Sequence, residues 1–174
     1  LKDTPRALAV MKDKKTIDLF NELGVLSPIE MEARHEIELE NYILKLQIES
    51  RVLGDLAQNH IIPTAIKYQN TIIENIKGMN EIFGKDAKKM ASTQYKIIES
   101  LSFHLNELKK FCDLMLEERK KANKLEDAEQ KAFAYCDNVK PYFQEIKYHS
   151  DKLELLIEDE LWPLPKLREL LFTK

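Results

Sequence analysis

The chain has 174 residues, with 44% hydrophobic and 33% charged residues, a formal net charge of −3 and only 4 Gly. Few turn-forming residues among many charges favour long exposed helices over a sheet protein, and the slightly acidic balance gives no reason to expect nucleic acid as a partner. The longest apolar runs span only a few residues, so the sequence predicts neither a membrane-spanning helix nor a signal peptide.

The N-terminal residues predict two short helices. Thr4-Pro5 can start one that runs through Met11, and residues 16–23 can form another that Gly24 ends. This segment is too apolar for a free linker. We expect its apolar side chains to pack on the base of a bundle or on whatever precedes Leu1, and they are Ile17, Leu19, Phe20, Leu23, Val25 and Leu26. Because the chain begins with Leu and not Met, we expect it to be a fragment of a longer protein.

A long helix is predicted from Ser27 to Phe83. Ser27-Pro28-Ile29-Glu30 is a capping box with Pro at the first helical position, and Gly84 is the expected stop. Pro63 removes a backbone donor and predicts a kink near His60. The apolar stripe has spacings of three and four: Leu39, Tyr42, Ile43, Leu46, Leu53, Leu56 and Ala57, then Ile62, Ile66, Gln69, Ile73, Ile76, Asn80 and Phe83.

A second long helix is predicted from Asp86 to Asn123. Its positions alternate spacings of four and three over five heptads, which is a seam for an antiparallel partner: Ala87, Ala91, Gln94, Ile98, Leu101, Leu105, Leu108, Cys112, Met115, Arg119 and Ala122. Cys112 here and Cys136 in the next helix lie on apolar faces, and we interpret both as reduced core residues of a cytoplasmic protein.

A third long helix is predicted to start at Asp127, with Gln130 completing a second capping box. Its seam is Ala132, Cys136, Val139, Phe143, Ile146, Ser150, Leu153 and Ile157. Pro141 interrupts it, and Trp162-Pro163-Leu164-Pro165 is expected to end it. A last short turn, residues 166–172, is apolar on one side.

The predicted fold class is therefore all-α. It is a long antiparallel bundle of three long, Pro-kinked helices with short helices at both ends. We assign residues 1–26 as short helices that link to an upstream domain, and residues 27–174 as the helical bundle domain.

Two short motifs contain catalytic residue types. Glu32-Ala33-Arg34-His35 has the E-x-x-H spacing of a di-iron ligand pair, but no other Glu in the chain has a His three residues later. His35-Glu36 also begins like the zinc motif H-E-x-x-H, which Leu39 breaks. His149-Ser150-Asp151 contains the residues of a hydrolase triad, but neighbours on a helix point in different directions. We expect Ser150 to lie in the seam and His149 to form hydrogen bonds beside it. We predict no catalytic, cofactor-binding or metal-binding residue in this chain.

Two further segments carry charge or apolar surface. Residues 117–124 form a charge cluster, Glu117-Glu118-Arg119-Lys120-Lys121 with Lys124, which we interpret as a solvated helix end whose cations suit the helix dipole. Residues 159–172 hold the chain's only Trp, two Pro and several Leu. Such an apolar terminal segment predicts docking, either on this bundle or on a neighbouring domain or subunit.

The terminal segment also carries a family resemblance. Tyr148-His149-Ser150-Asp151-Lys152-Leu153-Glu154, then residues 158–166 with Trp162-Pro163-Leu164-Pro165, and Arg168-Glu169-Leu170-Leu171-Phe172 resemble the C-terminus of type III, long-subunit bacterial glutamine synthetases. Leu19-Phe20, residues 24–26 and 33–37, Leu39-Glu40-Asn41-Tyr42 and residues 61–65 are similar to earlier stretches of the same region. The resemblance covers essentially the whole chain.

The resemblance implies a parent enzyme, a glutamate–ammonia ligase that uses ATP and divalent Mg²⁺ or Mn²⁺. The family's metal ligands and nucleotide contacts lie in an upstream catalytic domain, and nothing in this chain matches them. The chain would then be a noncatalytic C-terminal helical extension that binds no cofactor itself. Its partners would be the upstream catalytic domain and neighbouring subunits of a homo-oligomer, and its role structural or oligomer-organising.

Two alternatives stay open on the residues alone. The first is a free-standing adaptor, whose three long helices leave one apolar side uncovered to capture a helical partner or a second copy. The second is a ferritin-like enzyme, which the missing second metal motif disfavours.

Overall fold

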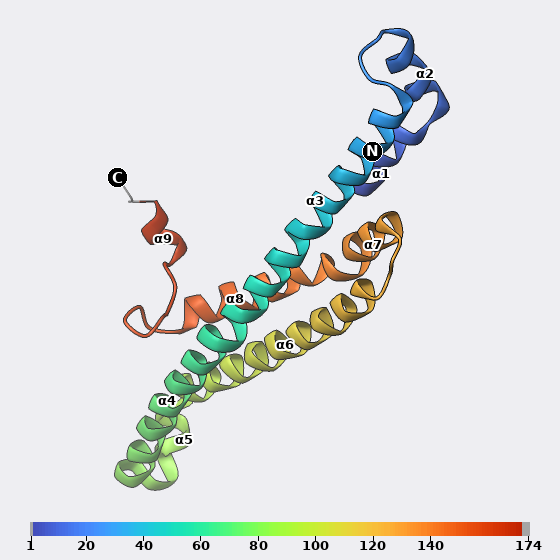
Figure 1. The fold of residues 1–174 in the computed structure, drawn as a ribbon. Coiled ribbons are helices and arrows are strands. Elements are labelled where there is room, and N and C mark those ends of the chain that lie inside the picture. Colours follow the sequence, from blue (N-terminus) through green and yellow to red (C-terminus); the bar gives the residue numbers. More distant parts are fainter. Residues whose placement is uncertain (1, 172–174) are drawn as a thin grey trace. The chain divides into compact units, whose positions relative to one another are not determined.

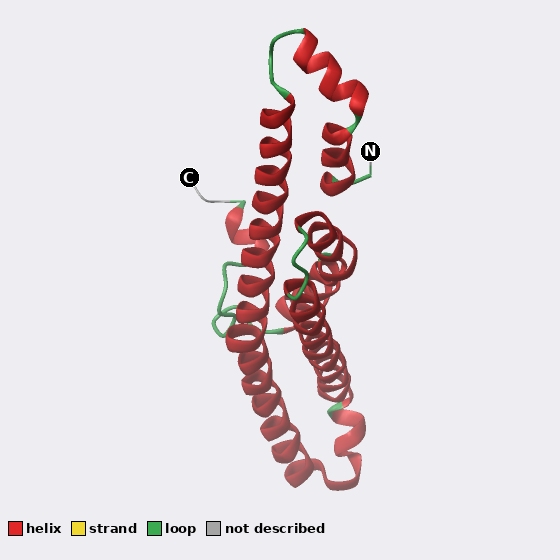
Figure 2. Cartoon of the chain, turned by 45° about the vertical axis from the view of Figure 1, so that its right-hand side comes forward, coloured by secondary structure: helices red, strands yellow, loops and turns green. Residues whose placement is uncertain are grey.

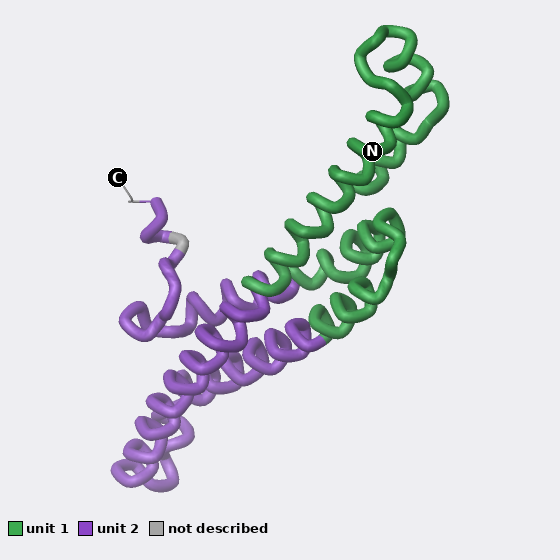
Figure 3. Tube along the Cα trace, in the orientation of Figure 1, with its two compact units in different colours: residues 1–52, 114–143 green, residues 53–113, 144–174 purple. Residues whose placement is uncertain are grey.

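The structure, a computed structural model, describes residues 2–171, and every regular element within them is helical (Figures 1 and 2). The predicted all-α class is confirmed. Contacts divide the chain into two compact units, residues 1–52 with 114–143 and residues 53–113 with 144–174 (Figure 3).

The N-terminal segment forms α1 (Thr4–Ala9), a 3₁₀ turn (Val10–Lys12) and α2 (Lys14–Glu22). Asp3 caps α1 by accepting from the backbone N–H of Arg6, and Gly24 ends the segment with φ of +64°, a conformation that favours glycine. The two predicted helices are confirmed to within two residues. The expected packing on the bundle is confirmed only in part, because Ile17, Phe20 and Leu26 are half-buried. The other three apolar residues, Leu19, Leu23 and Val25, are more than half exposed.

The helix α3 (Pro28–Asp55) begins at the predicted capping box. The Ser27 N–H donates to the Glu30 carboxylate at 2.7 Å, and the Glu30 N–H donates to Ser27 Oγ at 3.3 Å. A π-helical turn (Leu56–Ile61) follows, and α4 (Ile62–Phe83) continues the helix up to Gly84. Gly84 has φ of +52° and ends α4 as predicted.

The helix accommodates Pro63 and Pro141 in the same way, by a π-helical turn just before each. A π-helical turn, Leu56–Ile61 or Tyr135–Val139, directly precedes each, and the Lys140 N–H donates to the Tyr135 carbonyl, five residues back, at 2.9 Å. Proline lacks an N–H and clashes with the carbonyl four residues earlier, and the wider turn accommodates it. The helices therefore continue through both prolines.

Part of the predicted apolar stripe is wrong downstream of the first π turn. Downstream of it, the buried residues are Ile61, Thr64, Ala65, Ile72 and Ile76, and the predicted stripe residue Ile66 is 43% exposed. A π turn inserts one residue into the helical repeat, so it rotates the buried face away from the one extrapolated from residues 39–57.

The second long helix is divided in two. A 3₁₀ turn (Gly84–Asp86) leads into α5 (Ala87–Met90), Ala91 interrupts the helix, and α6 (Ser92–Asn123) follows. Every predicted seam residue is buried or half-buried. Within the second unit, α4 and α6 run antiparallel: Gln69 Nε2 donates to Ser102 Oγ at 2.7 Å, and Gln94 Nε2 donates to Asn75 Oδ1 at 3.2 Å.

The third long helix consists of α7 (Ala128–Ala134), the second π turn (Tyr135–Val139) and α8 (Pro141–Leu156). Asp127 caps α7 by accepting from the Gln130 N–H at 2.7 Å. In the first unit, Asn123 Oδ1 accepts from Gln47 Nε2 at 3.0 Å and from the Tyr135 hydroxyl at 2.7 Å. This one amide therefore joins α3, the end of α6 and the second π turn.

The expected end of the third helix is wrong by several residues. The helix ends at Leu156 and not at Trp162-Pro163, and α9 (Leu167–Leu170) follows after turns. Acidic residues 158–160 stand at the negative end of the helix dipole, which disfavours further helix. The predicted turn over residues 166–172 is confirmed through Leu170, and Phe172 lies outside the described residues.

Candidate functional site

The E-x-x-H motif does not assemble as a ligand pair. On α3, Glu32 is exposed, whereas His35 is only 2% exposed and its Nε2 atom has no hydrogen-bond partner among the described residues. The one group of three or more metal-ligating side chains within residues 2–171 includes neither residue. His35 is thus a core histidine of the first unit.

The three residues of the triad-like motif engage three different partners. His149 Nδ1 lies 2.9 Å from His104 Nδ1 on α6, and Ser150 Oγ donates to the Ile146 carbonyl at 2.8 Å. Asp151 forms an exposed ion pair with Lys147. This arrangement forms no nucleophile–base–orienter line, and His149 acts as the predicted hydrogen-bonding residue beside the seam.

The histidine pair lies in an aromatic setting within the second unit. The ring of Phe111 stacks on His149, with centroids 5.7 Å apart, and Phe103 packs edge-on against both histidines. Burial lowers the pKa of His149, and burial together with the neighbouring His149 lowers the pKa of His104. The pair therefore favours its uncharged form, and its contribution is packing between α6 and α8.

The charge cluster at the end of α6 forms ion pairs along its own helix. Lys120 Nζ lies 3.5 Å from Glu117 and Lys121 Nζ lies 2.6 Å from Glu118, and all four side chains are at least partly exposed. Such i, i+3 pairs on a helix surface are typical of a solvated face. The geometry agrees with the predicted solvated helix end.

The C-terminal segment docks within the second unit. Trp162 is 8% exposed and Lys166 is 8% exposed. The Lys166 ammonium donates to the Glu154 carbonyl at 2.8 Å and the Ile157 carbonyl at 2.9 Å, and it pairs with Asp159 at 2.7 Å. Lys166 therefore caps the last carbonyls of α8, which a helix end leaves without internal donors.

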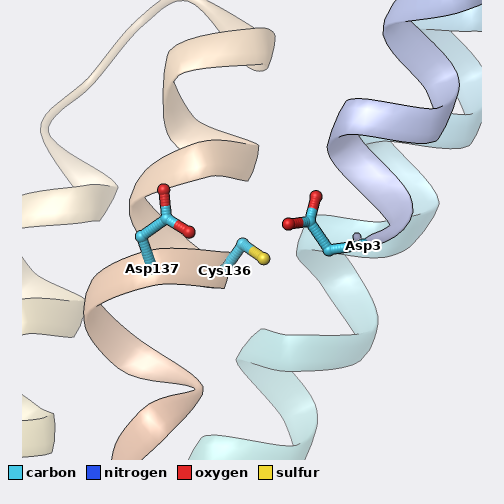
Figure 4. Close-up of side chains that lie close together, drawn as sticks. All are labelled: Asp3, Cys136 and Asp137. Carbon is cyan, nitrogen blue, oxygen red and sulfur yellow. The ribbon is translucent and has the colours of Figure 1, made fainter. Parts of the chain in front are cut away.

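One polar cluster has no counterpart among the residues predicted from the sequence; it lies at the junction of α1 with the second π turn in the first unit. Asp3, Cys136 and Asp137 place their ligand atoms within 4.8 Å of one another (Figure 4). Arg6 occupies this cluster: its guanidinium donates to Asp3 and, bidentately at 3.1 and 2.9 Å, to Asp137. No local signal could reveal it, because Asp3 and Asp137 are 134 positions apart in the sequence.

The electrostatics of this cluster favour the arginine. Hydrogen bonding from Arg6 lowers the pKa of Asp137, and for Asp3 the backbone and side-chain donors of Arg6 outweigh burial and also lower the pKa. The same two carboxylates raise the pKa of Arg6. The positive charge that a bound cation would bring to the two carboxylates is supplied by the chain itself, from Arg6.

The two cysteines are free, and Cys112 is buried in the α6 seam. Burial raises the pKa of the Cys112 thiol to about 11, so it stays protonated and unreactive at neutral pH. No helix in the described part of the chain is long and apolar enough to cross a membrane.

Fold and contacts together define an all-α chain of long helices, in which the residues of the two candidate catalytic motifs do not converge on one site. Residues 1–80 match the family described as the glutamine synthetase C-terminal domain. The chain is 45% identical to a glutamine synthetase of Bacteroides fragilis over 98% of its length, and 31% identical to the type-3 glutamine synthetase of Dictyostelium discoideum over 100%. A glutamine synthetase of Butyrivibrio fibrisolvens is 25% identical over 99% of the chain.

The predicted resemblance is confirmed: residues 1–80 match the glutamine synthetase C-terminal domain, and nearly the whole chain is similar to glutamine synthetases, one of them of type 3. It spans only 24% of the length of each of these relatives.

Proposed function

We propose that this chain is the helical C-terminal region of a long-subunit, cytoplasmic enzyme that forms glutamine from glutamate, ammonia and ATP with Mg²⁺ or Mn²⁺. The observation that carries the proposal is the 45% identity to the Bacteroides fragilis enzyme over 98% of the chain. The region itself is noncatalytic and organises the subunit or its homo-oligomer.

The noncatalytic role is supported by how the polar groups are used. Arg6, Lys166 and His149 each engage partners that join two segments of the chain. Catalytic groups, in contrast, converge on a pocket with perturbed pKa values and room for a substrate. The upstream catalytic domain and neighbouring subunits are the proposed partners of the exposed apolar residues Leu19, Leu23 and Val25.

The test starts from the native protein. An antibody raised to this chain recovers the endogenous polypeptide from cell extract, and ATP-dependent glutamine formation is assayed on the beads. We expect activity from a polypeptide about four times as long as this chain. An inactive polypeptide of about this length would overturn the proposal and favour the adaptor alternative.

The organising role needs a separate measurement. The recovered full-length polypeptide is compared with one truncated before Leu1, using mass photometry for the assembly and kcat for each. We expect truncation to change the number of subunits in the assembly. An unchanged assembly together with an unchanged kcat would contradict the role.

A further inference from the structure

The helix α3 is apolar on two opposite sides. Its inner face is buried and consists of Met31, His35, Leu39, Ile43, Leu46 and Ser50. A second set is about half exposed: Ile37 (54%), Leu44 (54%), Ile48 (54%) and Val52 (52%). Ile48 follows Leu39 by nine residues, about two and a half turns, so the two sets face in opposite directions.

We call the second set, with Asn41, the outer stripe of α3. All of it lies in the first unit. Ile37, Asn41, Leu44 and Ile48 are spaced by four, three and four residues, which is the a/d repeat of a helix that packs against another helix. Surface helices of globular proteins normally carry one apolar stripe and a polar opposite face. The outer stripe is therefore built as a second helix-packing seam.

The charges at the ends of the outer stripe define what fits there. Continuing the a/d repeat in both directions gives Arg34 before Ile37 and Arg51 after Ile48, and both arginines are exposed. A second copy of α3, whether parallel in register or antiparallel about the centre, would place Arg against Arg at both ends. Like charges facing each other oppose such pairing. The complementary surface has an apolar centre and acidic ends.

The length of the relatives indicates where the complementary surface is located. This chain accounts for only 24% of the length of each of the three glutamine synthetases it matches. We infer that the outer stripe of α3 is an interface for a helix of the parent polypeptide outside residues 1–174, with apolar residues opposite Leu44 and Ile48 and acidic residues opposite Arg34 and Arg51. The inference rests on the proposed function only in taking the parent to be a long subunit.

The test is carried out on the full-length polypeptide. The photo-reactive residue p-benzoylphenylalanine replaces Ile48, and in a matched control it replaces Leu155, which is 79% exposed on α8. Mass spectrometry then identifies the cross-linked peptides. We expect Ile48 to capture peptides from outside residues 1–174 with acidic residues beside the cross-link, and Leu155 to capture few. Cross-links from Ile48 to residues 1–174, or none, would overturn the inference.

A second measurement does not depend on the bulky photo-reactive side chain. Leu44→Cys and Leu155→Cys are labelled with a maleimide in the assembled full-length protein, and peptide mass spectrometry separates them from the native cysteines. We expect labelling at residue 44 to be about tenfold slower, because a covered residue reacts only when the interface opens. Equal rates would overturn the inference.

Neither measurement uses glutamine formation. A protected stripe on an inactive polypeptide would overturn the proposed function alone, and an exposed stripe on an active one would overturn the interface alone.

Discussion

The two ends of the chain are attached by different kinds of contact. In the first unit, α1 and the turn after it are held by ion pairs of Arg6 with Asp137 and Lys12 with Glu129, whose side chains are between 31% and 55% exposed. In the second unit, the C-terminal segment is held by Lys166, whose side chain is 10% exposed and whose ammonium reaches two backbone carbonyls.

The difference in exposure indicates which of the two attachments is the stronger. Exposed ion pairs contribute little net free energy and are screened by salt. Removal of a buried ammonium leaves the helix-end carbonyls that it binds without a donor. The full desolvation free energy of those carbonyls is then lost from stability. We therefore expect the C-terminal segment to stay attached under conditions that release α1.

The largest effect is expected from Trp162→Ala. The indole is 8% exposed, and its removal opens a cavity beneath the C-terminal segment. The free energy of unfolding, from urea titrations followed by circular dichroism, should fall by about 3 kcal/mol or more. Leu155→Ala, at a residue 79% exposed, is the control and should change it by less than about 0.5 kcal/mol. Equal effects at both positions would mean that the segment does not dock.

The next effect is expected from Lys166→Met, which keeps the aliphatic stem and removes the cap on α8. The carbonyls of Glu154 and Ile157 lose their donor, which costs about 2 kcal/mol. Amide hydrogen exchange of residues 158–171 reports the release. Arg168→Met at the exposed neighbour should leave the exchange of this segment nearly unchanged, and a matching loss in both variants would assign the effect to charge and not to capping.

A smaller effect is expected in the second unit, whose stability should fall when the pH is lowered. Burial lowers the pKa values of His104 and His149. At His149 the charges of Glu107 and Glu145 oppose this effect, whereas at His104 the charge of Lys152 adds to it. On acidification these histidines therefore bind protons in the unfolded chain at a higher pH than in the folded chain. Their contribution to stability is fully present above about pH 6.5 and is lost as the pH falls below it.

Urea midpoints at about pH 7.5 and about pH 5.5 measure this loss. The double variant His104→Gln with His149→Phe should have a flatter pH profile over this range. A wild-type midpoint that does not fall between the two pH values would contradict the prediction.

The smallest effect is expected at the N-terminal attachment. Arg6→Ala should accelerate amide exchange in α1 without affecting residues 158–171, and raising salt from about 0.1 M to about 1 M should do the same to the wild type. Arg6 lowers the pKa of Asp137, so this attachment persists on acidification until the pH falls below about 4. Lys2→Ala is the exposed control, and equal exchange in all three proteins would show that the ion pairs do not hold α1.

The fold could be predicted in most of its elements because its determinants are local. The capping box at Ser27, the stop at Gly84 and the heptad seam of α6 each depend on residues a few positions apart. The error at Ile66 arose because periodicity assumes a constant helical repeat, which a π turn changes by one residue. The early end of α8 was missed because its cap, Lys166, lies ten residues beyond Leu156.

The polar clusters were less predictable. His149 could be assigned a hydrogen-bonding role from its place beside the seam, but its partner His104 is 45 residues away in sequence. The Asp3–Arg6–Asp137 cluster depends on how α1 meets the second π turn, which no spacing in the sequence encodes. Side chains that pair across elements are fixed by packing, and packing is decided only once all the elements are in place.

The two π turns have a consequence for how this sequence can change. Each stores one residue more than a regular helix of the same rise would hold, directly before Pro63 or Pro141. A homologue that replaces either proline can lose one residue at that turn and regain regular α-helix, with every flanking side chain in its former orientation. We expect single-residue gaps in alignments of this family to concentrate at these two turns, and to coincide there with the loss of proline.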